Sequence, residues 1–235
     1  MNAVSTFDIA GLVFPIVSGK NEGDDFYIDR FIGSGFWIDG AGDFLTCRHI
    51  FEDLKEGQSP AIGQPFSNDR DKYIPIVSST FHPEYDIAVG RTISRDTRFL
   101  EPYEGIIAPG LDVSAFGFTE WGKKDGSLNL DVRFLKGHIT RTAEGPTGLP
   151  TPFIIETSFG SPGGFSGAPI LYGQKVVGML HGNIESKIQG YSLTEVHDGD
   201  KEFRETAYRI HEYGLAHRIA DLLVFLESCE INPFQ

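Results

Sequence analysis

The segment from Gly160 to Ile170 reads Gly-Ser-Pro-Gly-Gly-Phe-Ser-Gly-Ala-Pro-Ile and sets Ser166 among closely spaced glycines. Glycine adopts positive φ angles and allows a close approach of other atoms at little cost. The segment therefore predicts a tight turn that holds the Ser166 side chain forward and leaves the N–H groups of Gly164 and Ser166 free to bind an oxyanion. The alternative is a glycine-rich turn with an incidental serine. A phosphate-binding loop is disfavoured, because no Gly-Lys-Ser/Thr sequence follows.

Two upstream fragments carry the base and the carboxylate that a serine hydroxyl needs to attack at neutral pH. His49 follows an apolar strand-like stretch, and Asp86 directly precedes the apolar stretch Ile87 to Val89. A carboxylate that opens a buried strand needs a hydrogen-bond donor, which a histidine ring provides. We therefore expect Ser166, His49 and Asp86 to act together. The competing carboxylates in this region are Asp43, Asp53 and Glu84.

Short strand-like stretches dominate the chain up to about residue 190. They are rich in Val, Ile, Phe or Tyr and are separated by turn residues, which predicts an all-β barrel or sandwich. The shortage of long amphipathic helices argues against an α/β-hydrolase layout. One exception is Glu212 to Ser228, where apolar residues at helical spacing predict a C-terminal amphipathic helix. Residues 183–208 are polar and predict a long surface excursion, and residues 94–109 are the best candidate for a linker between two halves.

Composition and charge limit the classes of partner and compartment. The formal net charge of -13 argues against a nucleic-acid or anionic-membrane partner. The two cysteines, Cys47 and Cys229, cannot form the disulfide framework of a secreted protein, so we expect free thiols. The apolar run Ile9 to Val17 lacks the preceding basic residues of a signal peptide, and no segment reaches the ~20 apolar residues of a membrane span. We therefore expect a cytoplasmic protein.

The histidines give no sign of a metal centre. No paired metal-ligand spacing links the remaining histidines, which are His82, His138, His197, His211 and His217. A catalytic zinc is therefore not expected. No sequence feature calls for a cofactor either.

Three fragments together resemble the trypsin-like (chymotrypsin-fold) serine peptidases: Leu45 to His49, Asp86 to Val89 and Gly164 to Pro169. The likeness is closest to the bacterial branch that includes glutamyl endopeptidases and HtrA-like catalytic domains, and it covers about residues 10–185 in consistent order. Gly33 to Ile38 is similar to the G-S-G-F strand that precedes the histidine in this family. The resemblance implies two antiparallel six-stranded β-barrels with the active site between them.

The same resemblance implies a division of the chain. Residues 1–100 would form an N-terminal barrel that carries His49 and Asp86, and residues 101–210 a C-terminal barrel that carries Ser166. Residues 211–235 would form a C-terminal helix and tail. The whole would be one peptidase unit.

The chain departs from secreted members of the family beside the serine. Phe165 stands where they have an aspartate, and no Ile-Val-Gly-Gly activation start is present. The oxyanion loop must therefore be ordered in some other way, or be switched by a partner or ligand. The resemblance also implies a set of substrate-binding residues, namely Ser161, Leu180, His181 and Gly182. Ser161 and His181 are similar to the groups with which glutamyl endopeptidases and viral 3C-like peptidases hold Glu or Gln.

The function implied by the resemblance is a serine endopeptidase that hydrolyses peptide bonds through an acyl-enzyme. Narrow specificity and regulation by a partner or ligand are expected with it. The expected partners are a protein or peptide substrate and a regulatory protein. The alternatives are a catalytically idle binding module on the same fold, and an esterase that uses the same three residues.

Overall fold

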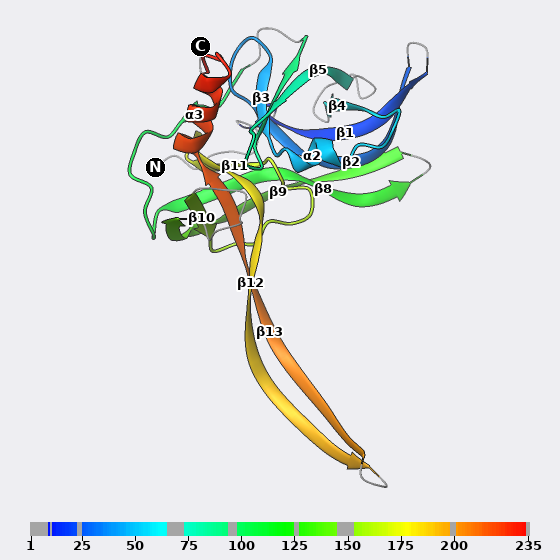
Figure 1. Cartoon of the computed structure of the whole chain (residues 1–235), viewed down its shortest axis with the longest axis vertical. Coiled ribbons are helices and arrows are strands. Elements are labelled where there is room, and N and C mark those ends of the chain that lie inside the picture. Colours follow the sequence, from blue (N-terminus) through cyan, green and yellow to red (C-terminus); the bar gives the residue numbers. More distant parts are fainter. Residues whose placement is uncertain are drawn as a thin grey trace.

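The computed structural model describes residue 9 and residues 11–22, 25–64, 73–93, 98–124, 127–144, 153–197 and 201–233. Strands make up most of its regular structure and form two sheets (Figure 1). The expected all-β class is therefore confirmed.

Six strands form the first barrel, closed in the order β1-β2-β3-β6-β5-β4. Every neighbouring pair is antiparallel. The strands are β1 (Val13–Glu22), β2 (Asp25–Trp37), β3 (Asp43–Thr46), β4 (Ser59–Gly63), β5 (Tyr73–Phe81) and β6 (Ala88–Thr92). A short helix, α2 (His49–Glu52), follows β3. The end of β3 and the start of β6 therefore lie next to each other, because Thr46 pairs with Ala88.

The second sheet has the strand order β11-β8-β9-β10-β13-β12-β7. Because β11 also pairs with β12, six antiparallel strands close on themselves and β7 adds to β12 in parallel. The strands are β7 (Glu101–Pro102), β8 (Asp112–Lys124), β9 (Ser127–Glu144), β10 (Phe153–Thr157), β11 (Pro169–Tyr172), β12 (Lys175–His197) and β13 (Lys201–Arg218). The chain thus forms two barrels in sequence order, as the resemblance implied.

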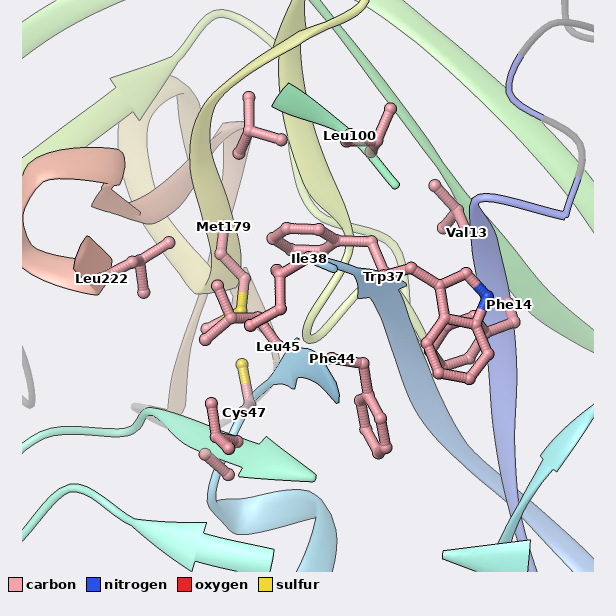
Figure 2. Close-up of a cluster of buried hydrophobic side chains, with 14 of the residues drawn as sticks. Val13, Phe14, Trp37, Ile38, Phe44, Leu45, Cys47, Leu100, Met179 and Leu222 are labelled. Carbon is pink, nitrogen blue, oxygen red and sulfur yellow. The ribbon is translucent and has the colours of Figure 1, made fainter. Parts of the chain in front are cut away.

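One hydrophobic cluster joins the first barrel to β12 and to the C-terminal helix α3 (Ile219–Ser228). Figure 2 shows members of this cluster, among them Leu45 of β3, Met179 of β12 and Leu222 of α3. All three side chains are fully buried. Burying one such side chain contributes about 1.5–3 kcal/mol to stability. The helix therefore clamps the barrels together through its apolar face.

The expected C-terminal helix is real but begins later than predicted. Residues 212–218 belong to β13, and the helix starts at Ile219. Leu215 and Ala216 are buried where β13 pairs with β10, so strand pairing in the second barrel overrides their helical spacing. The helix prediction for residues 212–218 was therefore wrong.

Residues 183–208 are also more regular than expected. The predicted surface excursion is a two-stranded ribbon in which β12 and β13 pair from Gly182 and Leu215 to His197 and Lys201. The ribbon leaves the body of the protein (Figure 1). Beyond its base, the described residues of the two strands pair only with each other. The position of the ribbon therefore depends on its base, where the same two strands belong to the second barrel.

Hydrogen bonds from Ser34 of β2 tie the first barrel to the serine segment. The fully buried Ser34 hydroxyl donates to the carbonyl oxygen of Gly164 at 2.8 Å and accepts from the N–H of Phe118 at 3.3 Å. Its own N–H donates to the carbonyl oxygen of Ser166 at 2.9 Å. One residue of the first barrel thus fixes both ends of the turn that carries Ser166.

Ser34→Ala tests this connection. The substitution leaves the Gly164 carbonyl without its Ser34 donor and the Phe118 N–H without its hydroxyl acceptor, so the free energy of unfolding should fall by about 1–3 kcal/mol in urea denaturation. The exposed serine of the ribbon provides a control: Ser186→Ala should change that free energy by no more than about 0.5 kcal/mol. Equal stabilities of the Ser34→Ala and wild-type proteins would show that the contact does not hold the barrels together.

Candidate active site

The first residue of α2, His49, is held by two hydrogen bonds to Asp86, which lies just before β6. Oδ1 of Asp86 accepts the main-chain N–H of His49 at 2.9 Å, and Oδ2 lies 2.7 Å from its Nδ1. The carboxylate therefore keeps the proton on Nδ1 and leaves Nε2 as the basic nitrogen. Both the ring and the peptide of His49 are fixed by one side chain.

Charge and burial set the protonation of this pair. The hydrogen bond to Asp86 raises the pKa of His49 above its usual value, although burial of the ring opposes this. Burial alone would raise the pKa of Asp86, but the hydrogen bonds from the side chain and main chain of His49 outweigh it and keep that pKa below its usual range. Asp86 is therefore an anion at neutral pH and stabilises a proton gained by His49.

The competing carboxylates are placed differently. Asp43 is paired through both oxygens with Arg91, at 2.6 Å for each contact. Glu84 and Asp53 flank the pair in sequence, but the carboxylate hydrogen-bonded to the His49 ring is that of Asp86. The structure therefore brings together the histidine and the aspartate that the sequence favoured.

The serine segment forms a turn that depends on two left-handed glycines. Gly164 has a φ of 95° and Gly167 a φ of 84°. A Cβ atom at Gly164 would collide with the ring of Phe31 and the carbonyl oxygen of Phe118, and one at Gly167 with the carbonyl oxygen of Ser34. These positions therefore require glycine, for lack of space as well as for backbone conformation.

One carbonyl oxygen accepts hydrogen bonds from the segment that carries Ser166 and from the segment that carries His49. The oxygen of Leu180 accepts the N–H of Gly167 at 2.8 Å and the Sγ–H of Cys47 at 3.3 Å. Gly167 directly follows Ser166, and Cys47 lies two residues before His49, so β12 contacts both segments of the chain. Within the described residues, Ser166 Oγ has no hydrogen-bond partner. Such catalytic contacts are often long in a free enzyme and tighten when substrate binds.

The two N–H groups expected to bind an oxyanion are available. Among the described residues, neither the N–H of Gly164 nor that of Ser166 donates to another protein group. The turn is closed instead by the N–H of Phe165, which donates to the Pro162 carbonyl at 2.9 Å, and by that of Ala168, which donates to the Phe165 carbonyl at 2.8 Å. The turn is thus closed by hydrogen bonds that do not involve the N–H groups of Gly164 and Ser166.

Two further histidines lie behind Asp86. The fully buried His217 of β13 places Nε2 3.1 Å from the main-chain oxygen of Asp86, and its ring stacks on that of His181 with 4.4 Å between centroids. Burial lowers the pKa of His181 to about 4 and that of His217 to about 3, so both rings are neutral at pH 7. His217 was not expected to have a role, although it is a polar residue among the apolar residues Leu215, Ala216 and Ile219.

The residues expected to bind substrate lie in two neighbouring segments. Ser161 is buried, and the side chain of Asn183 brackets it: Oδ1 accepts the Ser161 N–H at 2.5 Å and Nδ2 donates to its carbonyl at 2.8 Å. Leu180 is next to the serine turn, and Gly182 opens the base of the ribbon opposite Leu215. The substrate-binding role of Ser161, Leu180, His181 and Gly182 remains a prediction. No sequence pattern points to Asn183, and the only one that points to Ser34 is its position between two glycines.

Among the helices in the described part of the chain, none has the length and apolar character needed to cross a membrane.

Both cysteines are free thiols; Cys47 is buried and Cys229 half-buried. Burial, with the nearby charge of Asp86, raises the pKa of the Cys47 thiol well above its usual value.

The fold is similar to those of solved serine proteases. The active form of the Rv3671c protease from M. tuberculosis has a TM-score of 0.62 and 15% sequence identity, and the match covers 100% of this chain and 86% of that one. Its inactive form has a TM-score of 0.57 and 17% identity, with 94% and 90% covered. The HtrA-type protease AlgW, solved with a decapeptide, has a TM-score of 0.58 and 15% identity, with 93% of this chain and 64% of that one covered. At these identities, the likeness establishes the fold.

Sequence comparison identifies the family. A search of curated proteins finds no significant match. A family model described as the trypsin-like peptidase domain matches residues 33–179, which is more than half of the chain. The matched range begins beside Ser34, contains His49, Asp86 and Ser166, and ends beside Leu180. The chain therefore belongs to the trypsin-like peptidase family, whose members are serine protease hydrolases.

Proposed function

We propose that the protein is a serine endopeptidase in which Ser166 is the nucleophile, His49 the general base and Asp86 the group that orients the base. The observation that carries this assignment is the double hydrogen bond between Asp86 and His49. It fixes the tautomer that leaves Nε2 free to accept a proton. A histidine held in this way, together with a serine on a glycine turn, suits acyl transfer better than binding alone.

The proposed reaction has two halves. Ser166 Oγ attacks the peptide carbonyl carbon while His49 Nε2 accepts the hydroxyl proton. The C–N bond breaks as His49 gives this proton to the leaving amine, and an acyl ester remains on Ser166. A water molecule, deprotonated by His49, then attacks the ester and releases the acid and the free serine. Asp86 stabilises the imidazolium that forms in each half.

The oxyanion of each tetrahedral intermediate is assigned to the N–H groups of Gly164 and Ser166. Support comes from the turn, whose own hydrogen bonds leave these two donors unused within the described residues. Loss of one such donor typically costs about 3–4 kcal/mol of transition-state stabilisation. The Ser34 hydroxyl holds the Gly164 carbonyl and so positions the following peptide. This contact supports the proposal that the oxyanion loop is ordered without a new N-terminal amine.

The substrate is proposed to be a protein or peptide, and the enzyme is proposed to accept a narrow range of substrate sequences. One related fold, the HtrA-type protease AlgW, was solved with a decapeptide, which supports this class of substrate. Ser161, Leu180, His181 and Gly182 are proposed to contact it, with Asn183 holding Ser161 in place. Regulation by a partner or ligand belongs to the same proposal. The free thiols of Cys47 and Cys229 support action in a reducing compartment such as the cytoplasm.

A fluorophosphonate probe tests the proposed nucleophile. The wild-type protein should be labelled on Ser166, because the probe reacts with a serine that a neighbouring base activates. Ser166→Ala should not be labelled, and His49→Ala should be labelled at least ~10³-fold more slowly. Mass spectrometry of the labelled protein gives the site. An unlabelled wild-type protein that is folded and binds peptides would instead support the idle binding module, and labelling with ester but no peptide hydrolysis would support the esterase.

Two adjacent glycines test the oxyanion assignment. Gly164→Ala places a methyl group against Phe31 and Phe118 at a φ of 95°, so the turn must shift and peptide hydrolysis should slow by about 100-fold or more. A Cβ atom at Gly163 meets nothing within 4 Å, so Gly163→Ala should leave the rate within about twofold. Thermal unfolding of both variants controls for stability. Equal rates for the two variants would contradict the role of Gly164.

A further inference from the structure

We propose that Asp86, His181 and His217 form a binding site for a divalent transition-metal ion such as Zn²⁺, and that a metal bound there inhibits the peptidase. The inhibition rests on the proposed function, whereas the binding does not. The site would be regulatory, because it shares Asp86 with His49, whose ring this carboxylate orients. The ligand that is expected to regulate the peptidase would then be a metal ion.

The first argument is geometric. Asp86, His181 and His217 each offer one ligand atom, and these atoms all lie within 4.8 Å of one another. Three atoms so placed share a centre about 2.8 Å or less from each, and zinc bonds to nitrogen and oxygen are about 2.0–2.2 Å long. Inward movements of less than about 1 Å therefore reach bonding distance. Two imidazoles and a carboxylate are a ligand set that zinc and similar ions accept.

The second argument is the tautomer of His217. Its Nε2 lies 3.1 Å from the main-chain oxygen of Asp86, and a carbonyl oxygen only accepts hydrogen bonds. The proton is therefore on Nε2, and Nδ1 carries a lone pair. Metal-binding histidines almost always donate their second ring N–H to a carbonyl or carboxylate in this way. The nitrogen of His217 that a metal ion would bind is thus Nδ1.

The third argument is the missing partners of both rings. His217 Nδ1 and His181 Nε2 are buried, and within the described residues neither has a hydrogen-bond partner. An unsatisfied buried polar atom costs about 1–3 kcal/mol. Two such nitrogens on stacked rings beside one carboxylate are costly unless they bind something. One cation held between them and Asp86 would satisfy both.

A second group near Asp86 is less suited to a metal. Cys47, His49 and Asp86 also offer ligand atoms within 4.8 Å of one another. In this group, Cys47 Sγ donates to the Leu180 carbonyl and His49 Nδ1 is already bonded to Asp86 Oδ2. Binding there would have to break both contacts. The pair of unpartnered nitrogens favours His181 and His217.

The consequence for catalysis follows from Asp86. A dication bound to its carboxylate draws negative charge away from His49 Nδ1 and opposes a second positive charge on the imidazole. His49 then becomes a weaker base for the Ser166 proton. Zn²⁺ should therefore slow fluorophosphonate labelling of the wild-type protein, and a chelator should restore it.

Calorimetric titration of the full chain with Zn²⁺ tests the binding without using activity. Ser166→Ala protein, stripped with a chelator, should bind one Zn²⁺ per chain, and Co²⁺ should give visible absorption bands of a nitrogen- and oxygen-ligated site. His181→Ala and His217→Gln should each weaken binding at least about tenfold. The glutamine amide can still donate to the Asp86 carbonyl but supplies no imidazole. His138→Ala, an exposed histidine of β9, is the matched control and should bind as before.

Three results would overturn the site: no uptake of Zn²⁺, binding unchanged in both His181→Ala and His217→Gln, or binding lost in Cys47→Ser or His49→Ala but kept in those two variants. His181→Ala keeps the test decisive if His217→Gln does not fold. Stoichiometric binding that leaves fluorophosphonate labelling unchanged would overturn the inhibition. A protein that the probe never labels, yet that binds Zn²⁺ through His181 and His217, would refute the peptidase proposal and support the site.

Discussion

The carbonyl oxygen of Leu180 receives two hydrogen bonds, and through them one strand of the second barrel holds the segments that carry Ser166 and His49. One comes from the N–H of Gly167 and the other from Cys47 Sγ. The first fixes the chain just after Ser166, and the second fixes it just before His49. Strand β12 therefore contacts both the segment that carries the serine and the segment that carries the histidine. Ser34 adds a second connection from the first barrel to the same turn.

Strands β12 and β13 therefore do more than complete a barrel. Within a few residues they carry Leu180, the stacked pair His181 and His217, and Asn183, which holds Ser161. Beyond these residues the same strands become the exposed ribbon (Figure 1). A buried polar pair such as the rings of His181 and His217 is costly when partly satisfied and specific when fully satisfied. The base of the ribbon is thus the place where the proposed metal ion would act on His49 through Asp86.

Local chemistry made much of the site predictable. The glycine turn around Ser166 could be read from the sequence because positive φ angles and close contacts require glycine at Gly164 and Gly167. Asp86 could be chosen because a carboxylate at the start of a buried strand needs a donor. His217 could not, since it meets Asp86 through a contact between residues 131 positions apart. The start of α3 and the ribbon were missed for a related reason: cross-strand pairing, which no local pattern encodes, decides the state of residues 183–218.

A crystal structure of the protein after reaction with a fluorophosphonate tests the central claim most directly, namely that the two barrels present Ser166, His49 and two main-chain donors to one reacting atom. Phosphorus should be bonded to Ser166 Oγ, with the phosphoryl oxygen about 2.7–3.1 Å from the nitrogens of Gly164 and Ser166. His49 Nε2 should lie within hydrogen-bond reach of the serine oxygen, with Asp86 still on Nδ1. An adduct whose phosphoryl oxygen points away from both nitrogens, with the His49 ring turned from the serine, would contradict it.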